Sequence, residues 1–191
     1  MSPANRIRGI LGRVRFDEVL RTFAEFFERE GIRWAVAGGL AMHAWGYSRT
    51  TNDIDFVVEG NQQQRVITFA ESLGYETLFV SSGYSNHQNP SKHLGKIDFL
   101  YVYGDTAETL FAASTKRAAA NEVTAPVLRP EHLAMMKALA MKNRPMRTLI
   151  DAADVAFLLS LPETDQTAVR DYFAKQGLLD LFHAIERHRL S

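Results

Sequence analysis

The chain of 191 residues contains no cysteine. This absence excludes disulfides, thiolate nucleophiles and Cys-ligated zinc or iron–sulfur sites. Glycine and proline are sparse, with 12 and 6 residues, which excludes collagen-like and low-complexity classes. Lys and Arg together number 22, as do Asp and Glu, so no net charge attracts the whole chain to nucleic acid or to an anionic membrane. A polyanionic partner would have to bind to a local patch of positive charge.

Long apolar runs are also absent. No window approaches the 18 or so apolar residues that a membrane-spanning helix needs. Arg13, Arg15 and Asp17 interrupt the segment where a signal peptide would be apolar. We therefore expect a cytoplasmic protein with no membrane partner, and a length of this order is typical of about one domain.

The apolar pattern predicts alternating helices and strands in the first two thirds of the chain. Apolar residues from Phe16 onward recur at helical spacing until Gly31. Strands are expected at residues 34–37, 53–58, 76–80 and 96–103, with an extended piece at 123–128. Helices are expected at 40–45, 62–73 and 106–113, and residues 81–93 are expected to form a polar loop.

From Pro130 onward the signal is almost continuously helical. Pro130 and Glu131 suit the first turn of a helix, because proline is tolerated there and a carboxylate stabilises the positive end of the helix dipole. Further helices are expected from Met146 to Ser160 and at residues 164–176 and 178–189. The fold class is therefore α/β (α+β). A core of residues 1–128, which includes the N-terminal helix, precedes a helical portion of residues 129–191 that we expect to pack on it.

Asp53 and Asp55 lie two residues apart on a predicted strand, so both side chains project from one face. Two ionised carboxylates repel each other, and a divalent cation is the simplest compensation, although a lone Asp-x-Asp is commonly a solvated strand end. Oxygen ligands favour Mg²⁺ or Mn²⁺. Gly38 and Gly39 offer backbone that can approach a phosphate closely, and Asp98 supplies a third acid if its strand lies beside the first.

Together these residues resemble a known superfamily. The pattern Gly38-Gly39, Gly46, Arg49, Thr51 and Asp53-Ile54-Asp55 is similar to that of nucleotidyltransferases with the polymerase-β-like fold, a mixed sheet flanked by helices. Within that superfamily it most resembles the AbiEii-type and minimal nucleotidyltransferase families. The resemblance extends to residues 127–133 with Lys137, and to the later Arg147, Asp151 and Asp154.

The resemblance implies a metal-dependent transfer of NMP from an NTP to an acceptor hydroxyl. Asp53 and Asp55 would bind Mg²⁺ or Mn²⁺, and Asp98 would complete the second metal site or act as the base. Nucleotide-binding candidates are Gly38, Gly39, Arg49, Thr51 and Lys137. Arg49 could instead pair with the acids, and Lys137 could extend its ammonium to solvent. Arg147, Asp151 and Asp154 either contact nucleotide or acceptor or form an ion pair within their helix.

The resemblance leaves the acceptor open among tRNA or other RNA, protein and a small molecule, because one fold serves many substrates. The resemblance to AbiEii-type proteins implies that this protein is the toxin of a toxin–antitoxin or phage-defence pair and has a cognate partner. The alternative is a non-catalytic, antitoxin-like binding partner. A glycosyltransferase is disfavoured, since its Asp-x-Asp motif usually follows a larger nucleotide-binding sheet. The NTP preference and the oligomeric state stay open.

Overall fold

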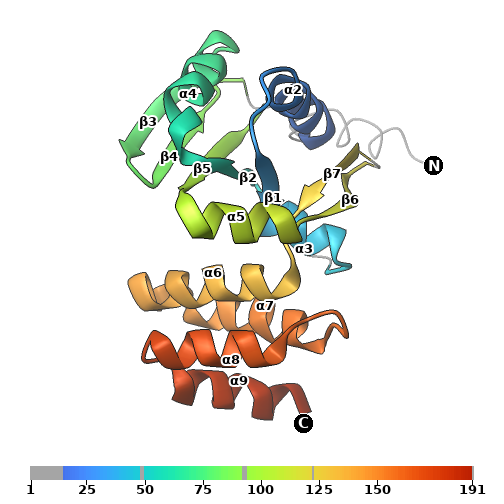
Figure 1. Cartoon of the computed structure of the whole chain (residues 1–191), viewed down its shortest axis with the longest axis vertical. Helices are drawn as coiled ribbons and strands as arrows, with labels where there is room; N and C mark the ends of the chain where they lie inside the picture. Colours follow the sequence, from blue (N-terminus) through green and yellow to red (C-terminus); the bar gives the residue numbers. More distant parts are fainter. Residues whose placement is uncertain (1–14, 48–49, 92–93, 122, 191) are drawn as a thin grey trace, which may run out of the picture. The chain divides into compact units, whose positions relative to one another are not determined.

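The computed structural model describes residues 15–47, 50–91, 94–121 and 123–190. Arg49 lies outside the described residues. The chain forms two compact units, one ending at Val127 and the other beginning at Leu128. The first contains the sheet and the second is helical (Figure 1).

The first unit is built on a seven-stranded mixed sheet with the strand order β3-β4-β5-β2-β1-β7-β6. At its centre, β2 runs parallel to β5 and antiparallel to β1, while β3 and β6 form the two edges. The strands are β1 (Trp34–Ala37), β2 (Asp53–Glu59), β3 (Glu76–Ser81), β4 (Tyr84–Gln88), β5 (Lys96–Val102), β6 (Thr115–Ala120) and β7 (Val123–Val127).

The helices of the first unit precede β1 or connect these strands. They are α2 (Phe16–Arg29), α3 (Gly38–Ala44), η1 (Gly60–Gln62), α4 (Gln63–Ser72) and α5 (Gly104–Ala113). The apolar face predicted for the first helix is buried in α2. Its Phe23 ring contacts Phe56 on β2 and Phe99 on β5, with centroids 5.5 and 5.6 Å apart. Phe26 stacks on Phe69 of α4 at 3.9 Å.

Because side chains alternate along a strand, this aromatic core also determines where the polar residues of β2 and β5 project. Phe56 and Phe99 are register partners and face α2. Asp55 and Asp98 precede them by one residue and are register partners as well. Their side chains therefore project from the opposite face of the sheet.

The second unit contains α6 (Pro130–Asn143), η2 (Pro145–Arg147), α7 (Thr148–Ser160), α8 (Gln166–Lys175) and α9 (Leu179–Leu190). Pro130 occupies the first turn of α6, as the sequence predicts. Asp165 caps α8, since its carboxylate accepts a hydrogen bond of 2.9 Å from the backbone N–H of Ala168. Among the described residues, no helix is both long and apolar enough to cross a membrane.

Two strands correct the sequence prediction. The polar loop expected at residues 81–93 is wrong in its middle, because β4 lies there and pairs with β3 and β5. Its Ser85 and His87 are buried and hydrogen-bonded to each other, so polar residues here satisfy one another inside the sheet. β6 was not expected, because its Lys, Arg and Ala residues favour strands weakly. Its pairing with β7 overrides that preference.

Candidate active site

Three carboxylates lie on one face of the sheet, at the beginning of β2 and β5. Asp55 is the register partner of Asp98, and Asp53 is the partner of Lys96. Register partners on adjacent strands project to the same side, with neighbouring strands about 4.8 Å apart. The structure therefore brings Asp55 and Asp98 side by side, with Asp53 two residues before Asp55 on the same face.

The turn between β1 and α3 lies directly against this pair. Gly38 has φ of +55°, and a Cβ atom there would lie 1.8 Å from Oδ2 of Asp55. A Cβ atom at Gly39 would lie 2.4 Å from Oγ1 of Thr51. The Thr51 hydroxyl donates to Oδ1 of Asp53 at 3.0 Å. Both glycines are required because the backbone approaches Asp55 and Thr51 too closely for any side chain.

Asp98 is the most buried of the three acids, with 7% of its surface exposed. Its Oδ2 lies 2.9 Å from the ammonium of Lys96. Its Oδ1 is buried and has no hydrogen-bond partner among the described residues. Such an oxygen is costly to bury unless a donor or a cation reaches it. Lys96 is a site residue that the sequence analysis missed, although its spacing of two from Asp98 on a strand could have identified it.

The donor set fits Mg²⁺ or Mn²⁺, both of which prefer oxygen ligands. Among the described residues, no three His, Asp or Glu side chains come close enough to enclose a metal ion on their own. Mg²⁺ commonly binds through one or two carboxylates and completes its shell with water and substrate phosphates. The pair Asp55 and Asp98, with an unpartnered buried oxygen on Asp98, suits that mode of binding.

Behind the carboxylates, on the opposite face, a buried hydrogen-bond chain joins β3, β4 and β5. The Thr77 hydroxyl donates to Glu71 at 2.7 Å, so it accepts from Nδ1 of His87 at 3.0 Å. Nε2 of His87 then accepts from Ser85 at 2.9 Å, and Ser85 accepts from Tyr101 at 2.9 Å. Burial lowers the pKa of His87, while Glu71 and Asp98 oppose that shift. Burial also raises the pKa of Tyr101 to about 12.

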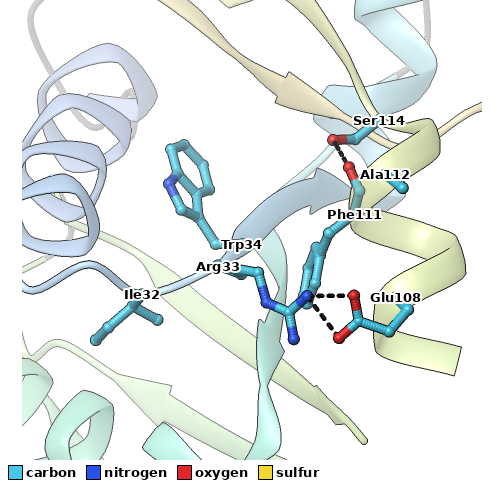
Figure 2. A pocket seen from close by; sticks show the side chains of 7 residues that line it. All are labelled: Ile32, Arg33, Trp34, Glu108, Phe111, Ala112 and Ser114. Carbon is cyan, nitrogen blue, oxygen red and sulfur yellow. Dashed lines mark hydrogen bonds and ion pairs between the residues drawn. The ribbon is translucent and has the colours of Figure 1, made fainter. Parts of the chain in front are cut away.

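An open hollow of about 410 Å³ lies elsewhere in the first unit (Figure 2). It is next to the beginning of β1, whereas Asp55 pairs with Ala37 at the end of that strand. Arg33 pairs with Glu108 at 2.8 Å and with Glu59 at 2.7 Å. Two carboxylates thus already pair with the single positive charge of Arg33, so this cation is not available to an anionic ligand in the hollow. Its lining residues are Ile32, Arg33, Trp34, Glu108, Phe111, Ala112 and Ser114.

In the second unit, Lys137 on α6 forms a buried ion-pair cluster with α7. Its ammonium lies 2.8 Å from Oδ1 of Asp151 and 2.7 Å from Oδ2 of Asp154. The side chains are 12%, 0% and 2% exposed, respectively. Sequence spacing did not predict this pairing between helices. The side chain of Arg147 lies outside the described part of the structure.

Comparison with known proteins shows the fold. No protein-family profile and no curated protein sequence matches the chain. Among solved structures, lincomycin-bound lincosamide antibiotic adenylyltransferase LnuA is 16% identical, with a TM-score of 0.56 over 78% of this chain and 98% of that one. The solution structure of the antibiotic-resistance factor ANT(2'')-Ia is 13% identical, with a TM-score of 0.55 over 91% of each chain.

The crystal structure of ANT(2'')-Ia in complex with adenylyl-2''-tobramycin is similar too. Its identity is 14% and its TM-score is 0.52, over 92% of this chain and 99% of that one. At these identities the likeness concerns the fold. The chain therefore has the mixed α/β fold of polymerase-β-like nucleotidyltransferases, as the sequence resemblance implies.

Proposed function

We propose that the protein is a metal-dependent nucleotidyltransferase, which transfers NMP from an NTP to an acceptor hydroxyl. The observation that supports this most strongly is the register pairing of Asp55 with Asp98, with Asp53 on the same face. Lys96 compensates one oxygen of Asp98, and the same face carries two further carboxylates in this fold. Mg²⁺ binds through one or two carboxylates together with substrate phosphates, so this arrangement supports a role in phosphoryl transfer.

Asp53 and Asp55 are the proposed ligands of Mg²⁺ or Mn²⁺, and Asp98 either completes the second metal site or acts as the base. The bound ions would neutralise charge on the triphosphate and lower the pKa of the attacking hydroxyl. The proposed nucleotide-binding residues of the first unit are Gly38, Gly39, Thr51 and Arg49. The close approach of Gly38 to Asp55 supports this, because it brings the β1–α3 turn directly against the carboxylates.

Lys137 also remains a proposed nucleotide-binding residue. The Lys137 ammonium donates to Oδ1 of Asp151 and lies within ion-pair distance of Oδ2 of Asp154. Because an ammonium has three donors, we propose that another of them binds a phosphate oxygen. The two buried carboxylates would then act by holding Lys137 in place.

The reaction balances without a further co-substrate. The acceptor hydroxyl oxygen attacks the α-phosphorus of the NTP and forms a new P–O bond. The bond from the α-phosphorus to the bridging oxygen breaks, and pyrophosphate leaves with that electron pair. The hydroxyl proton passes to the Asp98 carboxylate or to water. Oδ1 of Asp98, which has no donor among the described residues, is suited to receive it.

The test is transfer of label from each of the four α-labelled NTPs, with Mg²⁺ or Mn²⁺, into total RNA, cell protein and a small-molecule extract. Asp53→Asn and Asp55→Asn are expected to abolish labelling. Asp180→Asn is the matched control, because Asp180 is an exposed carboxylate on α9. Asp180→Asn should label as the wild type does.

Two results would reject this proposal. Full labelling by Asp53→Asn and Asp55→Asn would show that these carboxylates are not the metal ligands. No labelling by the wild type, together with retained binding of a fluorescent NTP analogue, would favour the alternative of a non-catalytic, antitoxin-like binding partner.

The acceptor that we propose is a small molecule rather than RNA or protein. The structural neighbours support this, since one is a lincosamide antibiotic adenylyltransferase bound to lincomycin and another is in complex with adenylyl-2''-tobramycin. The alternative to an enzyme that modifies a small molecule is a toxin with a cognate antitoxin. This alternative rests on the resemblance of the sequence to AbiEii-type families. Growth arrest on expression of the wild type, absent with Asp53→Asn and relieved by the product of the adjacent reading frame, would favour the toxin.

A further inference from the structure

A row of register partners extends the candidate site to the edge of the sheet. Phe79 on β3 pairs with Asn86 on β4, and Asn86 pairs with Asp98 on β5. Asp98 in turn pairs with Asp55 on β2. Register partners project to one face, so an aromatic ring, an amide and two carboxylates follow one another across four strands.

Two buried oxygens in this row lack donors. Oδ1 of Asn86 and Oδ1 of Asp98 are both buried without a hydrogen-bond partner in the described part of the chain. Each is an acceptor. Buried acceptors in native proteins almost always have a donor. The two unsatisfied acceptors on adjacent strands are therefore atoms that a bound molecule with hydrogen-bond donors would satisfy.

The edge of the row is aromatic and exposed. Phe79 is 55% exposed, and its ring centroid lies 6.2 Å from that of Tyr84 at an interplanar angle of 40°. Tyr84 lies two residues from Asn86 on β4, so it shares the same face. Exposed aromatic side chains that contact each other form a surface on which an apolar ring face can lie.

We propose that Phe79, Tyr84, Asn86 and Asp98 form the acceptor subsite. This inference rests on the proposed function. The acceptor is a small molecule with at least one ring and with hydroxyl or amino substituents. Its ring lies on Phe79 and Tyr84, and its donors reach Oδ1 of Asn86 and of Asp98. Phe79 is two strand spacings from Asp98, about 10 Å, which is a span that one substituted ring can bridge.

The charges of the row favour such a molecule over RNA. Asp55 and Asp98 are carboxylates, and the neighbouring cation, Lys96, is already paired with Asp98 at 2.9 Å. Beyond the carboxylates, Phe79, Tyr84 and Asn86 bring no basic side chain to the phosphates of an RNA acceptor. A hydroxyl or an amine, by contrast, is a donor that both unsatisfied oxygens can accept.

The subsite also assigns a role to Asp98. A hydroxyl that donates to Oδ1 of Asp98 is oriented next to Asp55, where the proposed reaction occurs. When the hydroxyl oxygen attacks the α-phosphorus, its proton passes along that hydrogen bond to Asp98. Asp98 is then the base, and Asn86 is a specificity residue that binds a second donor of the acceptor.

Two variants test the subsite, Phe79→Ser and Asn86→Leu. Val80→Ser is the matched control, because Val80 is the next residue of β3 and is 47% exposed. Its register partner is Ser85, so Val80 faces the other side of the sheet. The unlabelled acceptor compound is purified from the small-molecule extract by following the fraction that becomes labelled, and its concentration is varied at saturating NTP. Binding of a fluorescent NTP analogue is measured separately.

Phe79→Ser and Asn86→Leu are expected to raise KM for the purified compound at least ten-fold, while NTP binding stays within two-fold of the wild type. Val80→Ser should leave both quantities unchanged. Unchanged KM in Phe79→Ser and Asn86→Leu would overturn the subsite alone. Label in RNA or protein would overturn the subsite but keep the proposed transfer. No label in any fraction would reject the proposed function and the subsite with it.

Discussion

Gly38 leaves the space that the Asp55 carboxylate fills. A Cβ atom at position 38 would lie 1.8 Å from Oδ2 of Asp55, and the residue has φ of +55°. The turn after β1 thus leaves room for the carboxylate on β2 only because position 38 has no side chain. A side chain at position 38 would displace Asp55 from its place beside Asp98.

Gly38→Ala should therefore lower the free energy of unfolding by about 1–3 kcal/mol, because alanine is strained at this φ and its methyl group displaces Asp55. NTP binding should weaken as well. Urea unfolding and binding of a fluorescent NTP analogue measure the two effects. Gly83→Ala is the control, since no atom lies within 4 Å of a Cβ there. Wild-type stability in Gly38→Ala would contradict the close approach.

Asp53→Asn should leave stability nearly unchanged while it removes transfer. The Asn side chain keeps the oxygen that accepts from the Thr51 hydroxyl, and it removes one of two repelling charges. We expect the free energy of unfolding to stay within about 0.5 kcal/mol of the wild type. Urea unfolding in the presence of a chelator measures it. A loss of about 2 kcal/mol or more would mean that Asp53 is needed for the fold.

Lys137→Met should destabilise the second unit strongly. Without the ammonium, Asp151 and Asp154 lose a cation within 2.8 Å while both remain buried. Removal of one partner of a buried ion pair typically costs about 3–5 kcal/mol. Lys142→Met is the control, because Lys142 is exposed at the end of α6. If thermal unfolding of the two variants were the same, Lys137 would have no such structural role.

His87 should make stability depend on pH. Burial lowers the pKa of His87 in the folded protein below its ordinary value of 6.5. The unfolded chain therefore binds a proton that the folded chain excludes, and the free energy of unfolding falls as pH decreases below about 6.5. Urea midpoints measured between pH 5 and 7.5 test this. His87→Gln should reduce that dependence without removing it, because burial lowers the pKa of His132 as well. An equal slope in this variant would assign the dependence to other groups.

The spacing of apolar residues predicts α2, and the Asp-x-Asp spacing predicts that Asp53 and Asp55 share a face. Both predictions depend only on how side-chain direction repeats along one helix or one strand. The pairing of Asp55 with Asp98 depends on two strands 43 positions apart in sequence, so the sequence supports it only through the family resemblance. β4 was missed because Ser85 and His87 satisfy each other by contacts that composition does not reveal.

The β3–β4 hairpin joins the rest of the described sheet through the pairing of β4 with β5. Substitutions in β3, or a longer turn between β3 and β4, therefore leave the register of β2 with β5 intact. The edge of the sheet can therefore change in sequence without a change of register at its centre. Homologues with different acceptors are thus expected to differ first in this hairpin and last around Asp55.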